Sequence, residues 1–219
     1  MAQFQSDQTD TLASRCAMLH ALVRALPRHR FPVSDDGIPA NGVYFIFETG
    51  EAGHDSDRIV RIGSHTGIGN LGARLREHVT LNKNRSIFRK HIGRALLNQA
   101  RDPYLRVWNL DSTSRKDKDK NSSQIDVPKQ EEVEAAVLSV ITGTFTVVVL
   151  GATDHIRACE IEKLCIATVA GCDVCGPSKE WLGSHSTNSK IRESGLWQVQ
   201  HLRGKGLSAS DLRQLGSLI

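Results

Sequence analysis

Apolar residues at helical spacing lie near the start of the chain. Leu12, Cys16, Leu19, Leu22, Val23 and Leu26 repeat every three or four positions, and Pro27 follows them. Because this period gives a helix one apolar stripe and proline ends a helix, the pattern predicts an amphipathic helix over residues 10–26. The same period predicts helices over residues 71–79, 87–100, 130–141 and 155–169. A last short helix begins at Ser208, where Ser208 and Asp211 can form a capping box.

Short apolar runs rich in aromatic and β-branched residues are typical of buried strands. Such runs cover residues 43–47, 59–62 and 145–150. Between the first two, the polar, glycine-containing residues 48–58 can close an antiparallel hairpin with a long loop. This hairpin brings Tyr44 and Arg61 within reach of each other. Residues 104–110 are a candidate for a further short strand.

The order of these elements predicts an α+β fold with a small, mainly antiparallel, three-stranded sheet flanked by helices. It divides the chain into an N-terminal helical extension (1–40), a central domain (41–170) with an insertion (101–144), and an irregular C-terminal extension (171–219) that ends in a helix. Within the insertion, residues 112–124 break the pattern with Ser, Asn and alternating charges, which predicts a mobile loop.

Composition places the chain among ordinary globular proteins. Its 219 residues can bury a real core, 39% of them are hydrophobic, and no apolar stretch approaches the length of a membrane span. The N-terminal residues lack the apolar run of a secretory signal, and an odd number of cysteines, five, favours reduced thiols. We therefore expect a cytoplasmic protein without a membrane partner.

Positive charge is concentrated in one part of the chain. Residues 58–120 contain fifteen Lys and Arg but five Asp and Glu, whereas the net charge of the whole chain is only +4. A surface that binds phosphates needs such an excess, although a solvated basic face has the same composition. Trp181 and Trp197, in the irregular tail, can stack on bases or anchor the tail, and anchoring is the commoner use.

One set of polar residues has the chemistry for phosphodiester hydrolysis. That reaction needs a group that activates water, cations near the phosphoryl oxygens, and usually a carboxylate that holds a metal. Arg74 and His78 are four residues apart and project from one helix face. Glu162 is a candidate carboxylate, and Mg²⁺ suits a lone carboxylate because it keeps waters and phosphate oxygens as its other ligands. The full set is Tyr44, Arg61, Arg74, His78 and Glu162.

This arrangement resembles the GIY-YIG nuclease superfamily. Gly42-Val43-Tyr44 is similar to the first half of the family motif, and Arg61-Ile62-Gly63 stands in the place of the second half. The helix from Leu71 to His78, with its arginine and histidine four apart, resembles the branch of restriction endonucleases. Glu162-Lys163-Leu164-Cys165-Ile166 is similar to the helix that carries the metal-binding glutamate. The segments 176–183 and 191–197 resemble the C-terminal part of a group of GIY-YIG proteins of poorly defined role.

The resemblance implies roles for these residues. Tyr44 acts as the general base or positions the attacking water, Arg74 binds the scissile phosphate, His78 assists proton transfer, and Glu162 holds Mg²⁺ or Mn²⁺. A phenol has an unperturbed pKa near 10, so it needs nearby cations to serve as a base, and Arg61 and Arg74 are suitable. Arg61, Arg74, Arg89 and Lys90 are the residues expected to bind the substrate, and Asn188 is the nearest candidate for a late asparagine of the family.

The resemblance therefore implies a metal-dependent endonuclease that cuts DNA, with a restriction or phage-defence role by analogy. Because Arg61 stands where the family has tyrosine, one alternative is a protein that binds nucleic acid without cutting it. A second alternative is an interaction module stabilised by zinc. For that site, Cys172 and Cys175 have the spacing of half a zinc site, which His185 or His201 would complete.

Overall fold

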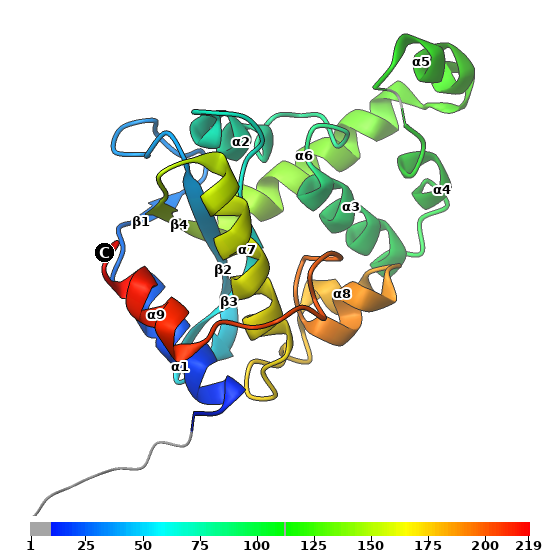
Figure 1. Ribbon diagram of the computed structural model, residues 1–219. Coiled ribbons are helices and arrows are strands. Elements are labelled where there is room, and N and C mark those ends of the chain that lie inside the picture. The colour runs from blue at the N-terminus through cyan, green and yellow to red at the C-terminus, as the bar shows by residue number, and fades with distance from the viewer. Residues whose placement is uncertain (1–9, 112) are drawn as a thin grey trace, which may run out of the picture.

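Strand β2 (Gly42–Gly53) runs through the middle of an antiparallel sheet. The computed structural model describes residues 10–111 and 113–219. In these residues β2 pairs with β3 (Ser56–Gly63) on one side and with β4 (Phe145–Gly151) on the other, and β4 pairs in turn with β1 (Arg28–Arg30). The order β1-β4-β2-β3 makes β3 an edge strand (Figure 1). The predicted α+β class is confirmed.

The sheet has four strands in the described residues, where the sequence predicts three. The missed strand, β1, consists of Arg-His-Arg and has no apolar period; its pairing with β4 through backbone hydrogen bonds defines it. The predicted long loop over 48–58 is also wrong. The two strands continue to Gly53 and from Ser56, so only His54 and Asp55 form the turn, with φ of 52° and 59°. Positive φ at both central residues is the geometry of a tight hairpin turn.

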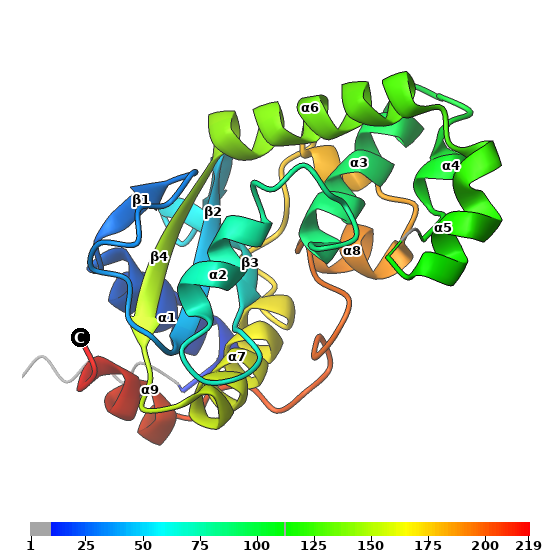
Figure 2. The same cartoon turned by 90° about the horizontal axis from the view of Figure 1, so that it is seen from above.

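Side chains of β2 alternate between the two faces of the sheet, as a period of two requires. Val43 and Phe45 belong to one hydrophobic core, whereas Tyr44 and Ile46 belong to a second core on the opposite face. The first core is covered by α1 (Leu12–Arg24), α7 (His155–Ala170) and α9 (Ala209–Gly216). The second is covered by α2 (Leu71–Glu77), α3 (Ile87–Gln99) and α6 (Val127–Thr144). Figure 2 shows these two groups of helices on either side of the sheet.

Local capping explains where these helices begin. The side chain of Ser86 accepts a hydrogen bond from the backbone N–H of Arg89 at the start of α3, and Asp154 does the same for Arg157 at the start of α7. The predicted capping box of Ser208 and Asp211 is present at the start of α9. Caps of this kind contribute about 1 kcal/mol each to helix stability.

The insertion is helical, which corrects two predictions. Residues 104–110 do not form a strand: α4 (Leu105–Trp108) lies there, and its Trp108 packs on Gly93 of α3 so closely that no Cβ would fit. The predicted mobile loop over 112–124 contains α5 (Arg115–Asn121) and a 3-10 turn (Ser122–Gln124), while Ser112 lies outside the described residues. Ser114 and Asp117 form hydrogen bonds typical of a capping box at the start of α5, a signal that the charge alternation obscured.

The C-terminal tail contains a 3-10 turn (Leu182–His185), α8 (Ser189–Ser194) and α9, joined by segments without regular structure. The buried indoles of Trp181 and Trp197 bind this tail to the sheet. Trp181 and Trp197 both donate hydrogen bonds to Oε2 of Glu48 on β2, at 2.9 and 3.1 Å. Burial raises the pKa of Glu48 against the opposing effect of these two hydrogen bonds. The two tryptophans therefore anchor the tail.

Among the described residues, no helix is both long and apolar enough to cross a membrane.

Candidate active site

A cleft of about 530 Å³ opens at the edge of the sheet, where β3 ends. Five parts of the chain contribute to its walls: the end of β3 with the residues that follow it, α2, α3, α7 and the tail. The lining residues are Arg61, Ser64, His65, Thr66, Arg74, Glu77, Ile87, His91, Cys159, Glu162, Gln198, Val199 and Gln200. We call this hollow the cleft.

The structure brings three of the five candidate residues to the walls of the cleft and puts the other two in the interior. Arg61, Arg74 and Glu162 line the cleft, whereas Tyr44 and His78 are fully buried beside it. Helix α7, which carries Glu162, packs in the first core, on the face opposite Tyr44. The two faces meet at the cleft because β3 is an edge strand, so residues from both sides can reach around it.

Tyr44 is held by a chain of hydrogen bonds. Its hydroxyl lies 2.9 Å from Nε2 of His78, and Nδ1 of His78 lies 2.8 Å from the hydroxyl of Ser86. Burial lowers the pKa of His78 well below 6.5, and the positive charges of Arg74, Arg61 and Arg89 add to that effect. His78 is therefore neutral at physiological pH, and it has one donor and one acceptor for its two partners. In one tautomer Nε2 accepts a hydrogen bond from the phenol of Tyr44. In the other, Nε2 donates a hydrogen bond to Tyr44 while the hydroxyl of Ser86 donates one to Nδ1.

The position of the Tyr44 ring depends on Gly63. The two residues are directly opposite in the β2–β3 register, and a Cβ on Gly63 would lie 2.3 Å from both Cζ and Oη of Tyr44. Since such a contact is impossible, only glycine at this position lets the ring lie across β3. A register irregularity at Ile46 and Phe47 follows the same pair. Bulges of this kind are often found beside active sites, where they turn side chains toward a new direction.

Arg74 lies between Tyr44 and the cleft. Burial alone would lower its pKa, but interactions with Tyr44 and with Glu77 outweigh that effect and raise it, so the guanidinium stays charged. Its NH1 donates to Oε2 of Glu77 at 2.7 Å and to the carbonyl of Arg85 at 3.2 Å. About a fifth of the side chain (22%) remains exposed to solvent. Arg74 can thus meet an anion in the cleft while it stays in contact with Tyr44.

Three buried polar atoms of cleft residues have no hydrogen-bond partner within the described protein: Nε of Arg61, Nε2 of His91 and Oε1 of Gln198. Arg61 donates through NH1 to the carbonyl of Trp197, and its guanidinium lies 5.2 Å from the centre of the Phe88 ring. Nδ1 of His91 accepts from Arg94 at 3.2 Å, which leaves the ring proton on Nε2. Two of these atoms, Nε of Arg61 and Nε2 of His91, are donors, and an anionic ligand in the cleft would satisfy both; Oε1 of Gln198 is an acceptor and needs a donor instead.

Comparison with known proteins agrees with this geometry. The sequence model of one family, described as a GIY-YIG domain, matches residues 8–219. The chain belongs to the GIY-YIG family. No curated protein and no solved structure matches it. GIY-YIG domains occur generally in endonucleases, so this one has a nuclease-type function, and nucleic acid is the substrate that such a domain implies.

The donors around Glu162 suit a hard cation in this GIY-YIG domain. Ser64, just after β3, donates its hydroxyl hydrogen bond to Oε2 of Glu162. In the described part of the chain no hydrogen bond is made to Oε1, and the carboxylate lines the polar cleft. Mg²⁺ and Mn²⁺ prefer oxygen ligands, and Mg²⁺ binds proteins through one or two carboxylates while it keeps several waters. The donor set therefore fits either ion.

Two residues that we expected to bind substrate do not line the cleft. Arg89 is in the interior, where its guanidinium pairs with Glu134 at 2.5 Å and donates to the carbonyl of His78 at 3.1 Å. It therefore positions α2 and His78 in this GIY-YIG domain, and it presents no charge to the surface. Lys90 is half-buried, and burial together with Arg94 lowers its pKa.

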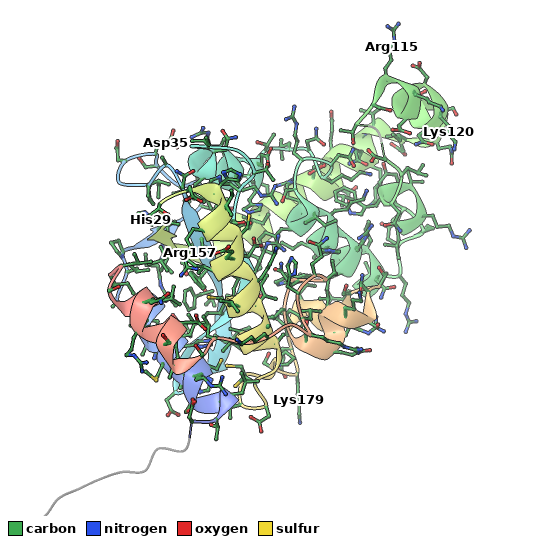
Figure 3. All side chains as sticks on the ribbon, viewed as in Figure 1. His29, Asp35, Arg115, Lys120, Arg157 and Lys179 are labelled. Carbon is green, nitrogen blue, oxygen red and sulfur yellow. The ribbon has the colours of Figure 1, made fainter. Side chains whose placement is uncertain are left out.

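The basic surface predicted over 58–120 is also smaller than its sequence suggests. Among the cations of this segment whose side chains the structure describes, four are buried: Arg58, Arg61, Lys83 and Arg89. Others are exposed at the far end of the insertion, where Figure 3 shows Arg115 and Lys120 pointing outward.

Sequence reasoning missed His91, Gln198 and Ser64 as cleft residues. His91 falls in the apolar stripe of α3, where the period marks it as a core position. A histidine among apolar residues was the only available signal, because its lack of a partner depends on the tertiary structure. Asn188, the candidate for the late asparagine, caps α8 through the backbone N–H of Lys190 and does not line the cleft.

We predict that Gly63→Ala destabilises the protein by about 1–3 kcal/mol, because the new methyl group displaces the Tyr44 ring. The matched control is Gly151→Ala on β4, where the nearest side-chain atom to a new Cβ, on Pro39, is 3.6 Å away. That control should stay within about 0.5 kcal/mol of the native chain. Chemical denaturation measures both free energies of unfolding, and equal values for the two variants would contradict the proposed contact.

We also predict that His91 makes stability depend on pH. Burial, followed by the charges of Arg61 and Arg94, lowers the pKa of His91 to about 3. The unfolded chain binds a proton at this residue below about pH 6.5 and the folded chain does not, so the free energy of unfolding falls as the pH decreases from 6.5. At pH 5 the loss from this residue is about 2 kcal/mol. His91→Gln should reduce the difference between pH 7 and pH 5 by that amount; an unchanged difference would mean that His91 is not buried as a neutral residue.

Proposed function

We propose that the protein is a magnesium- or manganese-dependent endonuclease that hydrolyses DNA phosphodiester bonds. The observation that carries the proposal is the convergence of Arg61, Arg74 and Glu162 on one cleft, with the Tyr44–His78 pair in contact with Arg74. Cations, a carboxylate and a proton-accepting phenol are the groups that this reaction needs.

Binding of the phosphate uses donors that already point to the cleft. Arg74 is charged and part-exposed, and Nε of Arg61 and Nε2 of His91 have no partner in the described protein. A phosphoryl group that lies between them would satisfy both buried donors and place negative charge beside two guanidiniums. Because these donors are held by Trp197, Glu77 and Arg94, little reorganisation is needed when charge develops.

Activation of water falls to Tyr44. After release of its own proton to solvent, Tyr44 would act as a phenolate and take a proton from the water whose oxygen attacks phosphorus. The bond to the 3′ oxygen would break in line with the attack, and that oxygen would take up a proton from solvent. His78 stabilises that phenolate by donation from Nε2, because Ser86 can donate to Nδ1 at the same time. Arg74 and Arg61 supply positive charge around it. A divalent ion held by Glu162 would stabilise negative charge on the phosphoryl and leaving oxygens.

The biological role that we propose is restriction or phage defence. It is supported by the resemblance of the Arg74–His78 pair to the restriction-endonuclease branch. Both residues of the pair contact Tyr44. This part of the proposal is an analogy at the level of the family.

The alternative function is binding of nucleic acid without cleavage. It is favoured by Arg61, which replaces the second tyrosine of the family and is tied to the carbonyl of Trp197. The two functions differ in their result on plasmid DNA with Mg²⁺: the endonuclease nicks or linearises it, whereas the binding protein retards it and leaves it intact.

We predict that Glu162→Gln lowers the rate of plasmid cleavage with Mg²⁺ by at least about 100-fold, because an amide cannot replace the carboxylate at the metal. Glu160→Gln is the matched control: it lies on the same helix, is exposed, pairs with Arg157 and does not line the cleft. Its rate should equal that of the native chain. Equal losses in the two variants, or full activity of Glu162→Gln, would remove Glu162 from the proposed site.

A second variant tests the role of the phenol. Tyr44→Phe keeps the ring that packs on Gly63 and removes only the hydroxyl bonded to His78. We expect cleavage to fall by about 10²–10⁴-fold, as for the loss of a general base, while gel-shift affinity for the same DNA is retained. Cleavage at the native rate would show that Tyr44 is only a core residue.

A further inference from the structure

A second group of reactive side chains lies at the other end of β3, away from the cleft. Cys16 and His20 are on α1, His54 is in the tight turn that precedes β3, and Cys175 follows α7 in the tail. One ligand atom from each residue lies within 4.8 Å of the corresponding atoms of the other three. We call these four residues the Cys/His cluster. It brings together three segments that are far apart in the sequence.

The distances in the Cys/His cluster suit tetrahedral coordination. Zinc binds sulfur at about 2.3 Å and imidazole nitrogen at about 2.0–2.1 Å, so the donor atoms of a tetrahedral site lie roughly 3.3–3.8 Å apart. Sγ of Cys16 lies 3.7 Å from Sγ of Cys175, and Sγ of Cys175 lies 3.9 Å from Nε2 of His20. Both cysteines are free, and the separation of their sulfurs is well beyond the roughly 2.05 Å of a disulfide.

The two sulfurs face each other directly, with Sγ of Cys16 within hydrogen-bonding distance of Sγ of Cys175. Zinc binds cysteine as the thiolate, so an ion that enters between these two atoms would release the thiol protons as it binds.

His20 is oriented as metal-binding histidines usually are. Its Nδ1 lies 2.9 Å from the carbonyl oxygen of Cys16, and donation to that oxygen leaves the lone pair on Nε2, the atom nearer Cys175. The backbone N–H of Ile59, on the edge strand, donates to the same lone pair at 3.2 Å. A metal ion and this amide compete for His20, so the assignment of this ligand is tested separately below.

We propose that Cys16, His20, His54 and Cys175 hold a structural Zn²⁺ ion that joins α1, the β2–β3 turn and the tail. Two sulfurs and two nitrogens are soft and borderline donors, which select zinc over the magnesium expected in the cleft. Cys16 and His20 are fully buried and Cys175 is nearly so, as in closed structural sites that keep no open position for a substrate.

The donor set differs from the one that the spacing of Cys172 and Cys175 suggests. His185 and His201 do not belong to the cluster; His20 and His54 replace them. Cys172 lies beside the cluster, with its sulfur 3.4 Å from Nε2 of His54, but outside the set of four. Only the fold brings α1 and the hairpin turn to the tail, so sequence spacing found one of the four ligands.

Metal analysis of the full-length, untagged chain, purified under reducing conditions with zinc and then desalted, tests the proposal. We expect one equivalent of zinc per chain. Cys175→Ser and Cys16→Ser should lose it, whereas Cys165→Ala, at a buried cysteine of α7 outside the cluster, should retain it. A native chain without zinc, or zinc that persists in both serine variants, would overturn the proposal. A Cys16–Cys175 disulfide in the reduced preparation, detected by thiol titration, would also overturn it.

Two further measurements keep the test valid if a serine variant does not fold. Removal of the ion from the native chain with a chelator should lower the melting temperature, and Zn²⁺ but not Mg²⁺ should restore it. Replacement by Co²⁺ should give the intense visible absorption of a tetrahedral site with thiolate ligands. If Mg²⁺ restores the melting temperature equally well, or if bound Co²⁺ shows no thiolate absorption, the proposed ligands are wrong.

A pair of variants tests whether His20 or the neighbouring thiol of Cys172 is the metal ligand. His20→Gln should weaken zinc binding at least roughly 10-fold, as the loss of a ligand does, whereas Cys172→Ser should change the affinity by no more than about threefold. The opposite result would show that Cys172 is the ligand and that His20 only caps the Ile59 amide. Because the cluster and the cleft lie at opposite ends of β3, cleavage assays are not needed for any of these outcomes.

Discussion

Burial of β2 on both faces is the constraint from which the rest of the architecture follows. A strand with helices on both sides must fill each side with its own row of side chains, so Val43 and Phe45 pack in one core and Tyr44 in the other. Tyr44 is therefore a core residue and a candidate catalytic residue at once. Its ring has space only because the facing position on β3 is Gly63. The first and second halves of the family motif thus lie side by side on two paired strands.

Hydrogen bonds and ion pairs in the second core then set the electrostatics around Tyr44. The pair of Arg89 and Glu134 is fully desolvated and holds the carbonyl of His78, the residue whose imidazole contacts the phenol. An ion pair buried in this way adds little net stability compared with apolar packing, but it is costly to break. Its contribution is positional: it fixes the end of α2 and the start of α3. The pKa of His78 is lowered chiefly by burial, and the charge of Arg89 adds to that effect.

The sequence predicts most helices and the three apolar strands, because each of them shows its period over many residues. It fails where the evidence lies in tertiary contacts. Strand β1 is polar and is defined by its pairing with β4. The spacing along α3 predicts Arg89 on an outer helix face, whereas the fold pairs it with Glu134 in the interior. For the site, motif order identified Arg74 and Glu162 as candidates at the cleft walls. His91 could not be identified from the sequence, because the lack of a hydrogen-bond partner at its Nε2 depends on how distant segments pack around it.

The anchoring of the tail has a consequence for the extent of the folded domain. The backbone N–H of Trp197 donates to the carbonyl of Val60 on the exposed edge of β3, and its own carbonyl accepts from Arg61. The tail thus shields the edge of the sheet from pairing with another chain and holds a cation of the cleft in place. A shortened form that stops at residue 170 would keep both halves of the family motif and still lack the support for one wall of the cleft.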